Sequence, residues 1–179
     1  MSLPTWQVCL RHRVTGQNRL PRIAVLGIGN ALRSDDGAGE LVARRLARSR
    51  LTHELDSFLV IDGGHAPENM TGELRRFGPE YVILIDAAEM GETPGAIRWI
   101  GIHEIDGISA STHTLPLSML AKYLALELGC EVNLLCIQPQ SVEIGDSVSD
   151  AVLKAVEETA NGLLDCLLEI ARPELNSSN

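Results

Sequence analysis

Two adjacent carboxylates, Asp35 and Asp36, are the first candidates for chemistry in this chain. They lie in the stretch GIGNALRSDDGAG, residues 27–39, between a short apolar run and a segment with helical periodicity. One aspartate there would be explained as a helix cap or as a first-turn carboxylate favoured by the helix dipole, worth about 0.5–2 kcal/mol. Two consecutive carboxylates exceed what one cap needs, so a function for at least one of them is as good an interpretation as capping.

Three further residues could take part in the same chemistry. Asp62 follows an apolar run and precedes Gly63 and Gly64, Asp86 follows a second apolar run, and His113 stands in a Ser-Thr-His-Thr segment before a predicted helix. Taken singly, each is more often a turn, surface or capping residue than a ligand. Taken together, carboxylates and one imidazole suit a borderline metal ion that accepts oxygen and nitrogen ligands.

Other site types fit the sequence less well. Gly27 and Gly29 begin a Gly-x-Gly pattern, but Leu32 occupies the third glycine position of a dinucleotide fingerprint. A turn that needs positive φ or close packing explains the two glycines better than a nucleotide site does. A phosphate loop, a Gly-x-Ser-x-Gly elbow and a His-Glu-x-x-His motif are all absent from the sequence.

The elements that position these residues alternate between short apolar runs and helical segments. We expect buried strands at 23–26, 58–61, 81–85 and 132–137, a mixed-pattern edge strand at 96–102, and helices at 37–50, 67–77, 116–128 and 149–170. This alternation predicts an α/β fold, a single-domain three-layer α/β/α sandwich with a mostly parallel twisted sheet. Ligands bind at the carboxyl ends of strands in such sheets, so Asp36, Asp62 and Asp86 should meet at one edge.

Length and composition indicate one globular domain. Residues 22–171 carry the alternating pattern, residues 1–21 form an N-terminal extension that we expect to be an irregular arm, and residues 172–179 form a polar tail that should fray. The net charge of −9 argues against a nucleic-acid surface. The sequence also lacks a membrane-spanning run of about 20 apolar residues and a signal-peptide pattern, which predicts a cytoplasmic location.

The four cysteines show no Cys-x-x-Cys spacing. Cys130, Cys136 and Cys166 lie in apolar surroundings, whereas Cys9 lies in the extension. We expect the first three to pack as small buried hydrophobic residues, and we do not expect a disulfide framework or a zinc site.

Five pieces of the sequence, in register, resemble the hydrogenase maturation proteases, which process the large subunit of [NiFe] hydrogenases. These pieces are GIGNALRSDDGAG (27–39), VIDGGHAPEN (60–69), LIDAAEMGETPGAIR (84–98), STHTLPL (111–117) and CIQPQSVEIG (136–145). They look most similar to the branch that serves formate-hydrogenlyase-type hydrogenases. The N-terminal extension is the one departure, since typical relatives lack it.

The resemblance implies an α/β/α endopeptidase that removes the C-terminal extension of a large-subunit precursor once nickel has been inserted. The implied catalytic and metal-contacting residues are Asp36, Asp86 and His113, and the nickel is presented by the substrate, so the free enzyme should hold no metal tightly. Asp35, Asp62, Gly63 and Gly64 are implied supporting or substrate-groove residues; Asp35 would orient its neighbour or cap the helix.

The expected partner is therefore a [NiFe] hydrogenase large-subunit precursor, with no nucleic acid and no membrane, and the protein is expected to be a monomer. Water activated by a carboxylate and water activated by the metal are both open as mechanisms. Three alternatives remain at this point: a non-catalytic nickel-binding maturation chaperone with the same ligands, a dinucleotide-binding module, and a general metallohydrolase.

Overall fold

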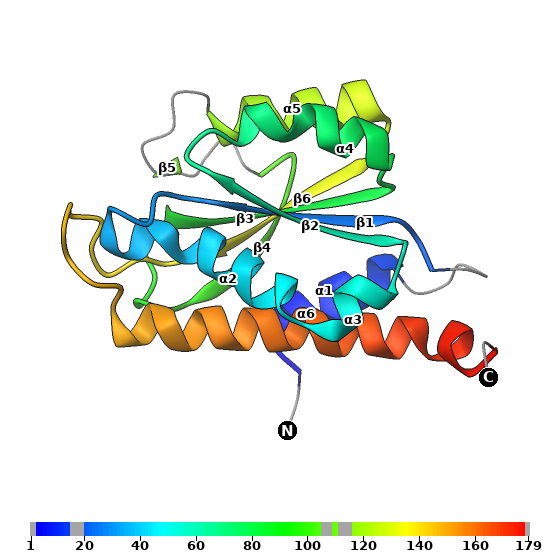
Figure 1. The fold of residues 1–179 in the computed structure, drawn as a ribbon. Helices are drawn as coiled ribbons and strands as arrows, with labels where there is room; N and C mark the ends of the chain where they lie inside the picture. The colour runs from blue at the N-terminus through cyan, green and yellow to red at the C-terminus, as the bar shows by residue number, and fades with distance from the viewer. Residues whose placement is uncertain (1–2, 15–19, 105–108, 111–115, 178–179) are drawn as a thin grey trace.

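The computed structural model describes residues 3–14, 20–104, 109–110 and 116–177, and it shows a three-layer arrangement (Figure 1). A central sheet is covered on one face by the layer that contains the long C-terminal helix α6, and on the other face by α4 and α5. The predicted α/β/α sandwich is confirmed.

The sheet is mostly parallel, as predicted. Its strands are β1 (Ile23–Ile28), β2 (Phe58–Gly64), β3 (Tyr81–Glu89), β4 (Ile97–Gly101), β5 (Ser109–Ala110) and β6 (Glu131–Ile137), in the order β2-β1-β3-β6-β4 with β5 beside β3. β1 pairs in parallel with β2 and β3, and β3 pairs in parallel with β6. The mixed-pattern segment is β4, an antiparallel strand at the edge of the sheet, whereas the two-residue β5 was not predicted.

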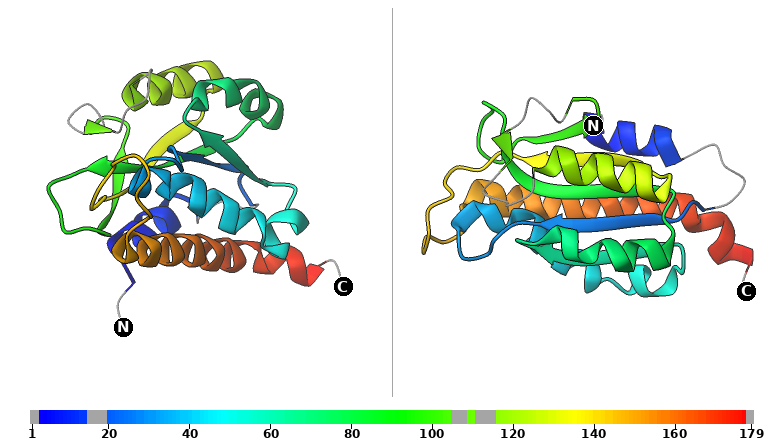
Figure 2. Two further views of the ribbon diagram at one scale, coloured as in Figure 1. Left: turned by 60° about the vertical axis from the view of Figure 1, so that its left-hand side comes forward. Right: turned by 90° about the horizontal axis from the view of Figure 1, so that it is seen from above.

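The helices lie close to the predicted segments, except at the two ends of the chain and at residues 50–54, where a separate short helix was not predicted. They are α1 (Thr5–Val14), α2 (Ala38–Ala47), α3 (Arg50–Glu54), α4 (Thr71–Phe77), α5 (Leu117–Leu128) and α6 (Asp150–Ser177), with short 3-10 turns η1 (Ser34–Gly37) and η2 (Pro67–Met70). α4 and α5 end at Gly78 and Gly129, each with φ of 64° and an N–H bonded back into the last turn. These two helices lie side by side over the sheet (Figure 2), and Arg75 of α4 donates to Glu127 of α5.

The core consists of two layers because successive strand residues face opposite sides of the sheet. Val25 and Ile85 face the layer of α2 and α6, whereas Leu26 and Leu84 face α4 and α5. β1 is buried along its whole length, which explains its uninterrupted apolar sequence. Cys130, Cys136 and Cys166 are buried, as predicted.

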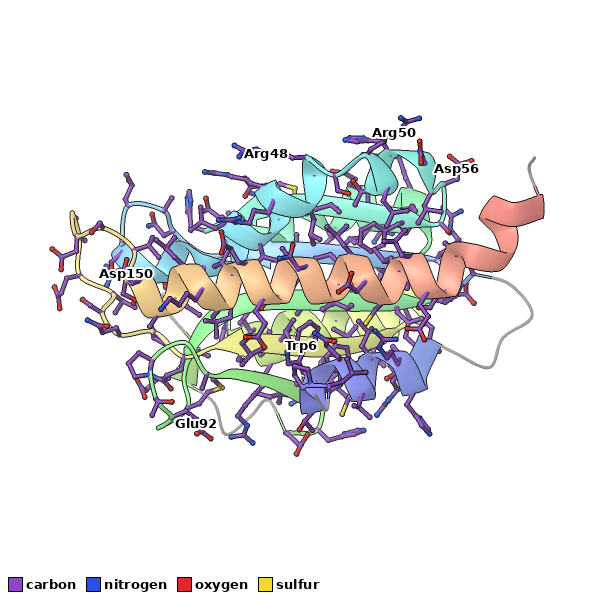
Figure 3. The ribbon with its side chains drawn as sticks, turned by 90° about the horizontal axis from the view of Figure 1, so that it is seen from below. Trp6, Arg48, Arg50, Asp56, Glu92 and Asp150 are labelled. Carbon is purple, nitrogen blue, oxygen red and sulfur yellow. The ribbon has the colours of Figure 1, made fainter. Side chains whose placement is uncertain are left out.

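The expectation of an irregular arm at the N-terminus was wrong, because residues 5–14 form α1. Trp6 and Leu10 of this helix are buried against the core, and Figure 3 shows Trp6 on the side of α1 that faces α6. The fit is close: a Cβ added at Gly162 of α6 would lie 2.5 Å from Trp6 Cη2. α1 has little amphipathic pattern of its own, so it is stabilised by this packing rather than by its propensity.

At the other end of the chain, α6 continues to Ser177 instead of ending at residue 170, so the backbone stays helical through most of the predicted tail. No helix within the described ranges is long and apolar enough to cross a membrane.

Candidate functional site

The carboxyl edge of the sheet collects the aspartates that the sequence singled out. In register, Gly27 of β1 lies between Asp62 of β2 and Ile85 of β3, so Asp62 and Asp86 flank the end of β1. The strand order also reverses at β1, because β2 lies on one side of it and β3 on the other. In open α/β sheets, ligands usually bind beside the strand where the order reverses. Asp36 reaches this edge from η1, the turn that follows β1.

Two details differ from the prediction. Asp62 and Asp86 were expected at strand ends, but β2 continues to Gly64 and β3 to Glu89, because the ladder runs past both residues. His113, the third predicted metal contact, lies outside the residues that the structure describes.

The glycines of residues 27–39 are required by the contact between the turn and the strands. A Cβ at Gly29 would lie 2.0 Å from the Asp36 carbonyl oxygen, and a Cβ at Gly39 would lie 2.1 Å from the Ile85 carbonyl oxygen. Gly29 also has φ of +148°, which side-chain-bearing residues rarely adopt. Backbone packing therefore explains the glycine pattern without a bound nucleotide.

Asp36 is fully buried, and its carboxylate lacks a hydrogen-bond partner. Its exposed fraction is 0%, and neither Oδ1 nor Oδ2 is bonded to any of the described residues. Burying a charged carboxylate without partners costs several kcal/mol unless a counter-charge compensates it. Such a group in a folded protein therefore calls for an explanation beyond stability.

Asp35 is equally buried but fully bonded. Its Oδ2 accepts the N–H groups of Gln140 at 2.8 Å and Ser141 at 3.2 Å and the hydroxyl of Ser149 at 3.0 Å, while Oδ1 accepts the Ser149 N–H at 2.7 Å. The Ser149 hydroxyl in turn accepts the N–H of Val152 in the first turn of α6. Asp35 thus ties the β6–α6 connection, residues 138–149, to η1.

Asp86 lies buried on β3, opposite Cys136 of β6. Its Oδ1 accepts the N–H of Ala87 at 2.9 Å. Burial, reinforced by the neighbouring Asp86, raises the pKa of the Cys136 thiol far above its ordinary value. Cys136 is therefore protonated at neutral pH and is unsuited to act as a nucleophile.

A comparison with known protein families decides the broad assignment. A family model described as "HycI: Hydrogenase maturation protease" matches residues 41–166, well over half of the chain. The chain belongs to the hydrogenase maturation protease family. The resemblance found in the sequence is thereby confirmed, and so is the expectation that the protein is an endopeptidase.

Individual relatives agree with the family match. The Hydrogenase 3 maturation protease of Escherichia coli strain K12 is 37% identical over 134 residues, which cover 74% of this chain and 83% of the relative. A putative hydrogenase maturation protease of Methanocaldococcus jannaschii is 31% identical over 153 residues, covering 83% and 90%. The crystal structure of the [NiFe] hydrogenase maturation protease HycI from Thermococcus kodakarensis KOD1 superposes with a TM-score of 0.77 at 30% identity, covering 89% of this chain and 98% of that one.

The family match starts at residue 41, after the acidic pair, so the roles of Asp35 and Asp36 in this maturation protease depend on the geometry. Among the residues described, no three His, Cys, Asp or Glu side chains converge as a metal site, and the predicted set also needs His113.

A carboxylate that the sequence analysis missed lies beside this edge. Glu40, in the first turn of α2, accepts the Ala31 N–H at 3.3 Å and the Arg44 guanidinium at 2.8 Å. Arg44 also donates to Asp62 at 2.8 Å, so it links the two carboxylates. Burial and the nearby Asp62 raise the pKa of Glu40 above its ordinary value. The Glu–Arg spacing of four residues on a helix was the available signal.

Gln138 is a second missed residue, although it lies in a motif that carried the resemblance. Its buried side-chain amide accepts the N–H groups of Met90 and Glu92 and donates to Glu89. In this protease it therefore fixes the β3–β4 connection to the end of β6.

Proposed function

We propose that this maturation protease removes the C-terminal extension of a [NiFe] hydrogenase large-subunit precursor after nickel insertion, and that Asp36, Asp86 and His113 contact the nickel that the precursor carries. The observation that carries the proposal is the buried carboxylate of Asp36, which has no hydrogen-bond partner among the described residues. A divalent cation delivered by the substrate would supply the missing counter-charge. Asp86, at the same edge, would add a second oxygen ligand.

In this mechanism the nickel belongs to the substrate, and contact with it reports that insertion is complete. Cleavage would then be conditional on the metal, because the Asp36 carboxylate is compensated only when nickel arrives. The attacking water is activated either by a carboxylate as general base or by the metal as Lewis acid. Asp35 would hold Asp36 in place through the backbone, and Asp62, with Gly63 and Gly64, would line the groove for the extension.

We also propose the metal affinity, the location and the oligomeric state of the enzyme. The free enzyme holds no metal tightly, because a set of three ligands leaves a coordination position open. The enzyme acts on the precursor in the cytoplasm without nucleic acid or membrane. It works as a monomer.

The test is a gel assay of precursor length with nickel-loaded and nickel-free precursor. The wild-type protein should shorten only the nickel-loaded form, whereas Asp36→Asn, Asp86→Asn and His113→Ala should leave it uncut. Asp56→Asn is the matched control, because Asp56 is an exposed aspartate at the opposite end of the sheet from Asp150 and the site (Figure 3). Nickel-loaded precursor that is bound but keeps its length would show a chaperone instead, and wild-type rates in the Asp36 and His113 variants would refute the site.

A further inference from the structure

Two large apolar side chains protrude into solvent next to the acidic pair. Leu32, four residues before Asp36, is 76% exposed, and Ile144, in the β6–α6 connection, is 74% exposed. The N–H of Gly145 donates to the Leu32 carbonyl oxygen at 3.1 Å, so the two segments meet although they are far apart in sequence. In Figure 1 both connections lie at the same edge of the sheet. We call Leu32 and Ile144 the apolar rim.

Several hydrogen bonds join the two segments under the apolar rim. The Ser34 hydroxyl donates to the Ser147 carbonyl oxygen at 2.9 Å, and Asp35 binds backbone N–H groups of the same connection. Ser34 is buried with φ of 50°, a disfavoured conformation for a residue with a side chain, and such conformations persist where the surroundings enforce them. Leu32 and Ile144 are thus held outward before any partner binds, which lowers the entropic cost of binding.

The surroundings of Ile144 are acidic, whereas Arg33 follows Leu32 on the neighbouring segment. Glu143 and Asp146 are exposed on either side of Ile144, and Asp150 is exposed at the start of α6. Residues 139–153 contain no other aspartate or glutamate, and they contain no Lys, Arg or His. A partner segment that carries positive charge is therefore favoured here.

We propose that the apolar rim docks the stretch of the precursor that leads into its nickel-bound segment, and that this stretch presents an apolar side chain to Leu32 and Ile144 and a Lys or Arg to Glu143 and Asp146. This inference rests on the proposed function, because Leu32 lies on the same turn as Asp36 and Ile144 lies on the connection bonded to that turn. Contacts made equally before and during the reaction lower KM and leave kcat unchanged. The apolar rim would therefore set affinity for the precursor, separately from the chemistry at Asp36.

The test compares kcat and KM for cleavage of nickel-loaded precursor. The double variant L32S/I144S should raise KM about tenfold and leave kcat within roughly twofold, because two apolar contacts are lost from binding only. L126S is the matched control: Leu126 is 87% exposed on α5 near the opposite edge of the sheet, so its KM should not change. The charge variant E143Q/D146N should raise KM and weaken its dependence on salt.

The possible failures are distinguishable. If the wild-type protein does not shorten nickel-loaded precursor, the proposed function is wrong. If the wild-type protein cleaves and both the L32S/I144S and E143Q/D146N variants keep the wild-type KM, the docking role of the apolar rim is wrong while the proposed function stands. Both variants change only exposed side chains, so both should fold, and each variant gives an answer independently of the other.

Discussion

The surroundings of Asp35 and of Asp36 differ sharply, although both side chains are fully buried. Asp35 accepts four hydrogen bonds from the β6–α6 connection, whereas Asp36 accepts none from any described residue at either carboxylate oxygen. Burial alone therefore does not separate a structural carboxylate from a functional one; the count of satisfied oxygens does. The Asp35 carboxylate ties two segments together, whereas the equally buried Asp36 carboxylate makes no hydrogen bond to any described residue.

The largest expected effect is on catalysis at Asp36. Asp36→Asn should lower kcat/KM on the order of 1000-fold, because a neutral amide gives up the several kcal/mol with which a carboxylate would stabilise a cation. The free energy of unfolding should stay the same or rise, because an uncompensated buried charge is removed. Cleavage kinetics and urea denaturation on one preparation measure both. A large loss of stability would place Asp36 with Asp35 as a structural residue.

The opposite pattern is expected at Asp35. Asp35→Ala should lower the free energy of unfolding by about 3 kcal/mol, because three backbone N–H groups lose a charged acceptor. Activity should fall as well, because the turn that carries Asp36 loses its hydrogen bonds to the β6–α6 connection. The Asp35→Asn variant keeps one acceptor oxygen, so its free energy of unfolding should fall less. Urea denaturation checks the series. Full stability in Asp35→Ala would contradict the structural role.

A third change tests stability far from the site. Gly162→Ala would usually stabilise a helix by about 1 kcal/mol, but here the added Cβ would lie 2.4 Å from Gln7 Nε2. We expect a net loss of about 1–2 kcal/mol from overpacking against α1, with kcat unchanged. Asn161→Ala, at the exposed neighbouring position, is the control and should not destabilise. A stabilised Gly162→Ala protein would mean that α1 contributes little to the fold.

The smallest effect concerns Glu40 and pH. Its pKa is raised above the ordinary 4.5 by burial and by Asp62, so above pH 4.5 the folded state holds the proton more tightly than the unfolded chain does. The free energy of unfolding should therefore fall as pH rises from 4.5 through the raised pKa of the folded state. In the Glu40→Gln variant this part of the dependence should disappear. Urea denaturation from pH 4 to 8 measures it, and identical pH curves for the two proteins would contradict the assignment.

Much of the fold could be predicted from the sequence because its signals are local. The runs 23–26 and 81–85 are buried on both faces of the sheet, so their sequences are continuously apolar and predict strands. Gly78 and Gly129 end helices because glycine favours the backbone conformation needed there. α1 could not be predicted in this way, since its buried residues Trp6, Gln7 and Leu10 pack against segments that are distant in sequence, such as α6.

The site was harder to predict than the fold. Topology alone placed Asp36, Asp62 and Asp86 at one edge, but the difference between Asp35 and Asp36 depends on residues 140–149, more than 100 positions away. No local pattern reports such a contact. Gln138 was missed for the same reason, because its hydrogen bonds join segments that only the tertiary structure brings together. Glu40 was missed although its spacing to Arg44 is local, because that spacing does not reveal the nearby Asp62.

The bonds that Asp35 makes also have a consequence for biosynthesis. Gln140, Ser141 and Ser149 leave the ribosome long after residues 27–39, because chains emerge from the N-terminus. Until then the Asp35 carboxylate lacks these partners, and the turn that carries Asp36 lacks its main restraint. A nascent chain can thus form its first βαβ unit early, yet it acquires an ordered acidic turn only when translation has reached α6.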